Sequence, residues 1–114
     1  MGELNEILSS LTLELRRGTI VLSVLSQLNE PQYGYTLVKS MEEKGVSIDT
    51  NTLYPLLRRL EKQELLVSEW ETDGNKPRKY YKRTELGNVV YEKLAAQWRE
   101  MTESMNRLLE QGTI

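Results

Sequence analysis

The sequence contains neither cysteine nor histidine. Without thiolates and imidazoles the chain cannot form disulfides, build Cys/His zinc sites, or use these groups in nucleophilic and acid–base catalysis. A Gly-rich phosphate loop and a Gly-x-Ser-x-Gly motif are also missing from it. The residues therefore give little support for an enzyme, and we expect no catalytic residues, no bound metal and no cofactor.

Long apolar segments are missing as well. No apolar run approaches the roughly 18 residues that a membrane-spanning helix needs. Residues 1–6 are acidic and lack the basic start of a signal peptide. We therefore expect a cytoplasmic protein that does not enter a membrane.

The charge of the chain is small in total but unevenly distributed. The 114 residues correspond to one domain with a small core, which an oligomeric interface would help to complete. The formal net charge is -2, yet residues 51–83 hold eight basic and five acidic residues, which leaves -5 for the rest. Because the distribution of charge matters more than its sum, this basic middle is a candidate surface for nucleic acid.

Apolar spacing in the first 45 residues predicts helices. Leu4, Ile7, Leu8 and Leu11 indicate a short amphipathic helix near the start. A second run extends from Leu15 through Ile20 to Leu28 and is stopped by residues 29–31, which include a proline. Its β-branched residues leave a strand as the competing interpretation. A further helix is predicted to open at residues 33–35 and to close at Gly45, a natural left-handed cap.

Residues 51–62 form the next predicted helix. Residues 49–51 are all suitable N-cap types, and Pro55 is expected in or near the first turn. The inward face is apolar and consists of Leu53, Leu56, Leu57 and Leu60. Residues 65–71 then alternate with period two, residues 72–77 have turn chemistry, and residues 78–83 form a second strand. Together these two strands predict a β-hairpin.

Thr84 is expected to cap a long final helix, with Glu85 in its first turn, where the helix dipole favours an anion. The apolar residues of this helix have nearly heptad spacing and are Leu86, Val90, Leu94, Trp98, Met101, Met105 and Leu108. A small domain cannot cover such a seam alone, so a second copy of the chain is the simplest partner. We expect a homodimer.

The order of elements predicts a mainly α-helical fold with a small β-hairpin, a winged helix-turn-helix. Residues 1–84 would form the DNA-binding unit and residues 85–114 the dimerisation helix, in one compact body. In this motif the second helix of the pair enters the major groove and the hairpin follows the neighbouring backbone. The predicted DNA-binding residues are Tyr33, Tyr35, Asn51, Thr52, Tyr54, Arg58, Lys62, Lys76, Arg78 and Lys79. Trp70 and the Tyr80–Tyr81 pair are interpreted as hairpin packing.

Four segments carry a resemblance to a known family. They are residues 15–19, 31–35, 52–61 and 77–87, and they include Thr-Leu-Tyr-Pro-Leu-Leu and Arg-Lys-Tyr-Tyr. The chain resembles the PadR-like transcriptional regulators, in particular the short subfamily with a single C-terminal dimerisation helix. The resemblance implies a winged-helix dimer that binds a palindromic operator, usually represses, and is released by a small aromatic or hydrophobic effector.

The resemblance also gives Trp98 a second interpretation. In short members such as a lactococcal multidrug-binding regulator, a tryptophan on the last helix lines a pore at the dimer interface and stacks on flat drugs. Trp98 stands at the matching position, so it is either part of the dimer core or an effector-binding residue for a planar ligand.

Two residues depart from the family pattern. Asn51 and Glu64 stand where glycine is usual, and if the second position requires a positive φ, Glu64 costs about 1 kcal/mol.

The competing function is a winged-helix module that binds protein without specific DNA binding.

Overall fold

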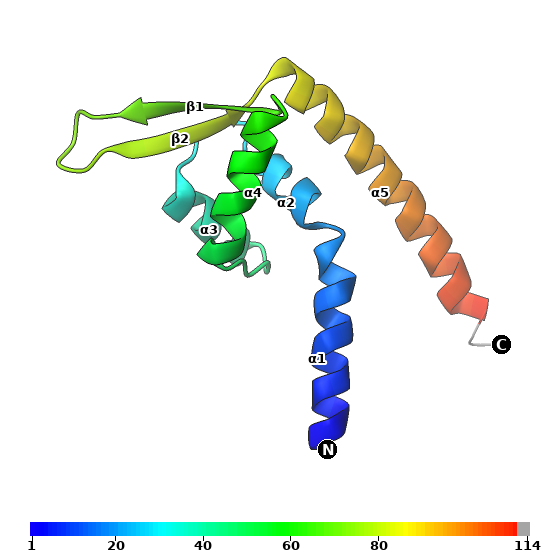
Figure 1. The fold of residues 1–114 in the computed structure, drawn as a ribbon. Helices are drawn as coiled ribbons and strands as arrows, with labels where there is room; N and C mark the ends of the chain where they lie inside the picture. The colour runs from blue at the N-terminus through cyan, green and yellow to red at the C-terminus, as the bar shows by residue number, and fades with distance from the viewer. Residues whose placement is uncertain (112–114) are drawn as a thin grey trace.

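The chain forms five helices and one β-hairpin over residues 1–111, the part that the computed structural model describes (Figure 1). The elements are α1 (Gly2–Arg17), α2 (Ile20–Ser26), α3 (Gly34–Glu43), α4 (Thr50–Lys62), β1 (Leu66–Glu71), β2 (Arg78–Arg83) and α5 (Glu85–Gln111). The predicted mainly α fold with a hairpin and a long C-terminal helix is confirmed. No helix among residues 1–111 is long and apolar enough to cross a membrane.

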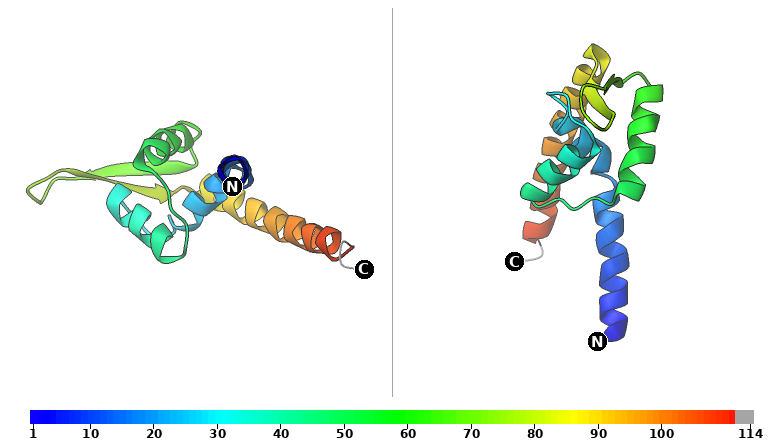
Figure 2. Two further views of the ribbon diagram at one scale, coloured as in Figure 1. Left: turned by 90° about the horizontal axis from the view of Figure 1, so that it is seen from below. Right: turned by 90° about the vertical axis from the view of Figure 1, so that its left-hand side faces the viewer.

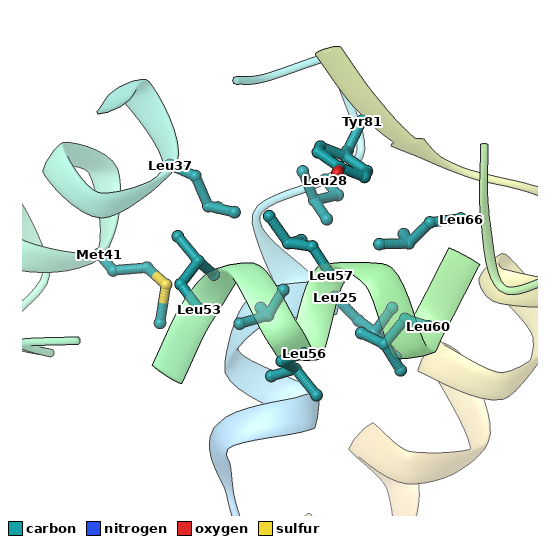
Figure 3. Close-up of a cluster of buried hydrophobic side chains, with 11 residues drawn as sticks. Leu25, Leu28, Leu37, Met41, Leu53, Leu56, Leu57, Leu60, Leu66 and Tyr81 are labelled. Carbon is teal, nitrogen blue, oxygen red and sulfur yellow. The ribbon is translucent and has the colours of Figure 1, made fainter. Parts of the chain in front are cut away.

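The core lies where α2, α3 and α4 meet the base of the hairpin (Figure 3). The predicted inward face of α4 is buried throughout. Each leucine removed from water in this way contributes about 1.5–3 kcal/mol of hydrophobic stabilisation. The other members of this core are Val24 and Leu25 of α2, Leu28 just after α2, Leu37 and Met41 of α3, and Leu66 and Tyr81 of the hairpin.

Helix α4 begins one residue earlier than predicted. Asp49 is its N-cap and accepts a hydrogen bond from the backbone N–H of Asn51 at 2.9 Å. Pro55 therefore lies inside the helix as its sixth residue, in the second turn rather than the first. Because proline has no N–H, the carbonyl of Asn51 lacks its usual donor four residues on.

The end of α4 is a Schellman motif. The N–H of Leu65 donates to the carbonyl of Leu60 at 3.0 Å, and the N–H of Glu64 donates to that of Glu61 at 2.9 Å. Glu64 has a φ of 65°, so this position does adopt the left-handed conformation. Gly45 closes α3 in the same way with a φ of 86°, as predicted.

The first two helices differ from their predicted bounds. Leu15 belongs to α1, which extends to Arg17, and α2 starts only at Ile20. Helix α2 also ends at Ser26, before the predicted stop at residues 29–31. The reason is local, since Gln27 and Leu28 donate to carbonyls only three residues back and tighten the last turn.

The hairpin runs straight into α5. Thr84 alone separates β2 from α5, and its hydroxyl accepts the N–H of Gly87 at 2.9 Å, which confirms the predicted cap. A Cβ added at Gly87 would lie only 2.0 Å from the carbonyl oxygen of Leu65, so the start of α5 passes directly against the beginning of the hairpin.

Arg83 joins three parts of the fold at this point. Its guanidinium group donates to the carbonyl of Leu25 at 2.5 Å, to Asn29 Oδ1 at 3.3 Å and to Asn88 Oδ1 at 2.7 Å. It also lies 4.3 Å from the ring centroid of Tyr91. One side chain thus connects the base of the hairpin with the end of α2 and the first turns of α5.

The predicted seam of α5 divides into two parts. Val90 and Leu94 pack against the core of their own chain. Leu86 is 50% exposed, and the more distal residues Trp98, Met101, Met105 and Leu108 are also largely exposed. Helix α1 has no buried residue at all, and its apolar face projects from the body together with the distal part of α5 (Figure 1). The division into a DNA-binding unit of residues 1–84 and a dimerisation helix of residues 85–114 stays a prediction.

Candidate nucleic-acid interface

The outer face of α4 is polar and open. Asn51, Thr52, Arg58 and Lys62 are exposed on the side of the helix away from its buried leucines. Arg59 joins Arg58 and Lys62 around a shallow depression on the same helix. The N-terminal turn and the middle of this face therefore present hydrogen-bonding and cationic groups to solvent.

Tyr54 is exposed only in part, at 42%. A Cβ added at Gly34 would lie 2.1 Å from the Tyr54 hydroxyl oxygen, so the ring fills the space above this glycine. Tyr54 therefore spaces α4 from α3 as well as facing solvent, and the absence of a side chain at Gly34 makes this close approach possible.

The predicted wing residues behave differently from one another. Lys76 and Arg78 are exposed, and the Arg78 guanidinium lies 4.8 Å from the ring centroid of Tyr33. Tyr33 also packs edge-on against Tyr80 and stacks on Tyr35, with ring centroids 5.2 Å and 6.3 Å apart. Tyr33 thus supports Arg78. The side chain of Tyr35 remains largely open to solvent, with 64% of it exposed.

Lys79 is held against the protein. Its Nζ lies 3.5 Å from Glu61 Oε1 and 5.4 Å from the ring centroid of Tyr81. Lys79 was predicted from the sequence to be one of the DNA-binding cations of the wing. In the structure its charge is paired with a carboxylate of α4. This contact links α4 to β2 and leaves Arg78 and Lys76 as the unpaired cations of the predicted wing set.

Trp70 was expected to pack within the hairpin, and that interpretation is wrong. Its side chain is 63% exposed. It lines a cleft of about 370 Å³ between α4 and the hairpin, together with Tyr33, Gly34, Tyr54, Arg58, Pro77, Arg78, Lys79 and Tyr81. The alternation of β1 could have indicated this position, because Trp70 shares a face with the buried Leu66 but lies farther toward the tip.

Trp98 lies apart from this surface. It is 45% exposed and borders a cavity of about 350 Å³ between α2 and α5. The hydroxyl-bearing residues Thr19, Ser23, Ser26 and Tyr91 also line it, together with Arg99. A single protomer thus has an aromatic and partly polar cavity beside the predicted effector residue.

Comparison with known proteins agrees with this arrangement. Residues 21–93 match the model of the transcriptional regulator PadR-like family. The chain belongs to the PadR-like family. A PadR family transcriptional regulator from Eggerthella lenta has 54% identity and a TM-score of 0.90, with 96% of this chain and 98% of that chain covered.

More distant relatives give the same result. A PadR-like transcription factor from Bacteroides fragilis shares 34% identity at a TM-score of 0.72, over 87% of this chain and 98% of that one. The transcriptional regulator Rv3488 of Mycobacterium tuberculosis shares 32% identity over 68% of this chain and 73% of its own length. PadR-like proteins are transcriptional regulators and not enzymes, so this protein is a transcriptional regulator with a winged-helix fold.

Proposed function

We propose that this PadR-like regulator binds duplex DNA, with α4 in the major groove and the hairpin on the adjacent backbone. The observation that carries the proposal is the continuity between the open polar face of α4 and the exposed cations of the wing. Arg58 and Arg78 line one cleft between these two elements. Arginine pairs bidentately with guanine or phosphate, so this cleft supplies both base and backbone contacts. We propose that this regulator works in the cytoplasm, as expected from the sequence.

We propose further that the active unit is a homodimer on a palindromic operator, where it represses transcription. The apolar faces of α1 and distal α5 have no cover in the protomer, and a second copy supplies matching faces. A two-fold axis through such an interface places two α4 helices on two half-sites, which requires a palindromic sequence.

Replacing Arg58 with alanine tests DNA binding. We expect a loss of about 1–3 kcal/mol, roughly 5- to 150-fold in affinity, because a charged base contact is removed. The measurement is fluorescence anisotropy with labelled duplex from upstream of the gene, at two salt concentrations. Lys93→Ala is the control, since it removes the same charge from an exposed position on α5.

The result would contradict the proposal if wild type bound this duplex no better than a random one. In that case a winged-helix module that binds protein becomes the better description, as the net charge of -2 permits. Steep weakening of binding with salt is the second expected signature, because phosphate contacts release counterions.

We also propose that the regulator responds to a planar hydrophobic or aromatic molecule beside Trp98. The support is a half-exposed indole ring at the edge of a cavity of about 350 Å³. Aromatic faces suit planar ligands, and this volume lies within the range of small-molecule sites.

A further inference from the structure

Trp70 lies near the tip of the wing, where it borders two hollows of different character. In the antiparallel register Ser68 pairs with Tyr81 and Trp70 with Lys79, so these side chains share one face of the hairpin. That face is directed toward α4, because Ser68 donates to Glu61 and Lys79 pairs with the same carboxylate. Trp70 therefore shares the face of the hairpin that is directed toward α4, which carries Arg58, whereas Arg78 pairs with Glu71 and alternates onto the other face.

The described residues of the protomer leave most of the Trp70 side chain uncovered. It is 63% exposed, although tryptophan is among the side chains that gain most from burial. Its cleft is lined by Arg58 and Arg78, and no carboxylate belongs to that lining. An apolar ring in one cleft with the Arg78 guanidinium matches a deoxyribose next to a backbone phosphate.

The second hollow beside Trp70 is acidic. It is a groove of about 580 Å³, lined by Pro31, Trp70, Thr72, Tyr80 and the carboxylates Glu30, Glu69, Glu71 and Asp73. Its lining contains no basic residue. Like charges repel one another within a Debye length of about 8–10 Å, so these carboxylates disfavour a phosphate in the groove. The charges thus favour a backbone phosphate on the cleft side of Trp70, where Arg78 lies.

We infer that Trp70 is a DNA-contacting residue, which lays its ring against the sugar of the backbone held by Arg78, next to the base contact of Arg58. The inference rests on the proposed DNA binding and adds a contact that is apolar rather than ionic. The acidic groove disfavours the duplex on its own side, so the contact forms on the cleft side of the ring.

The test uses Trp70→Ala and Trp70→Phe in the full-length protein with the same labelled duplex. We expect Trp70→Ala to weaken binding about tenfold, a size typical of aromatic contacts to nucleic acid. The slope of log Kd against log salt stays at the wild-type value, since no phosphate contact is lost. Arg78→Ala lowers both the affinity and the slope, and Trp70→Phe retains most of the affinity.

Fluorescence gives an independent measurement. The chain has two tryptophans, so Trp98→Phe leaves Trp70 as the only indole. Its emission is expected to change when the duplex is added. Val67→Ala is the control on the opposite face of β1, where the side chain is 49% exposed, and it leaves the affinity unchanged.

The outcomes separate this inference from the proposed function. If wild type binds specifically but Trp70→Ala binds equally well and Trp70 emission does not respond, the inference is overturned and DNA binding stands. If Trp70→Ala reduces the salt slope as much as Arg78→Ala does, Trp70 only positions Arg78, and the contact is again refuted. Absence of specific binding by wild type removes both proposals.

Discussion

Glu64 is held in a backbone conformation that most residues avoid. Its φ of 65° belongs to the left-handed region, where an L side chain approaches the following carbonyl. The position is imposed by its neighbours, because the Schellman bonds from Glu64 and Leu65 close α4 before β1 starts. The backbone at this residue therefore carries strain that glycine would relieve.

We expect Glu64→Gly to stabilise the fold by about 1 kcal/mol, because glycine adopts this conformation without a steric penalty. Chemical denaturation of both proteins at equal concentration measures the difference. Glu92→Gly is the control of opposite sign, since an exposed glycine inside a helix costs about 1 kcal/mol. A lower stability of Glu64→Gly would show that the carboxylate makes a compensating contact.

Single residues differ in how well the sequence foretells them. The cap at Thr84 depends on neighbours in the chain and follows from local pattern. The left-handed position of Glu64 was raised only by the family pattern, which usually has glycine there. The pairing of Lys79 with Glu61 joins two elements that lie far apart in sequence, and no local signal reports it. The packing prediction for Trp70 was wrong for a third reason. The face of β1 that carries Trp70 could be predicted, but the point along the hairpin at which α4 stops covering this face could not.

At the scale of elements, α1 and the distal part of α5 have apolar faces without a cover. Leu4, Ile7, Leu8 and Leu11 of α1 are each more than half exposed, as are Met101 and Met105 of α5. Isolated monomers rarely expose so much contiguous apolar surface. These two helices are therefore the proposed dimer interface.

Met105→Glu is expected to dissociate the dimer, since it places a charge at the centre of an apolar seam. The protomer should stay folded, because Met105 is 51% exposed and outside the core. Sedimentation should then report a mass near 13.3 kDa, with weaker binding to a palindromic duplex. Ala96→Glu, which adds the same charge on the opposite, exposed side of α5, should remain dimeric; a dimeric Met105→Glu protein would refute this interface.

Element bounds could be predicted where strong signals mark them. The strands of the hairpin and the start of α4 agree with their predicted limits to within one residue, because turn residues and an N-cap define them. The end of α2 was wrong, since three-residue hydrogen bonds stop the helix before Pro31 does. The division of the α5 seam could not be foreseen either, because it depends on how far α2 reaches along α5.

At the scale of the whole molecule, the hairpin and α5 leave the helical core on opposite sides (Figures 1 and 2). The proposed DNA surface and the cavity beside Trp98 are thus separate regions of one body. The order of elements and the basic middle of the chain predicted the winged-helix architecture. The cavity could not be predicted, because Thr19, Ser23 and Ser26 meet Trp98 only through the packing of α2 on α5.

A planar aromatic dye is expected to bind at this cavity and quench Trp98. In the Trp70→Phe background Trp98 is the only tryptophan, so its emission reports binding directly. Trp98→Ala should weaken dye binding, followed by the dye's own fluorescence, by at least several-fold because the stacking surface is lost. Equal dye affinity in Trp98→Ala would exclude an effector role for this residue.

The single residue between β2 and α5 has a mechanical consequence. Thr84 is fixed on both sides, by its bond to Gly87 and by a hydrogen bond from its hydroxyl to the carbonyl of Glu64 at 2.7 Å. Arg83, just before it, is anchored to α2 and α5. The connection is therefore held by several hydrogen bonds, and we expect the wing to follow α5 as a rigid lever if α5 tilts. In a dimer built on α5, the angle between the two long helices would set the distance between the two wing tips.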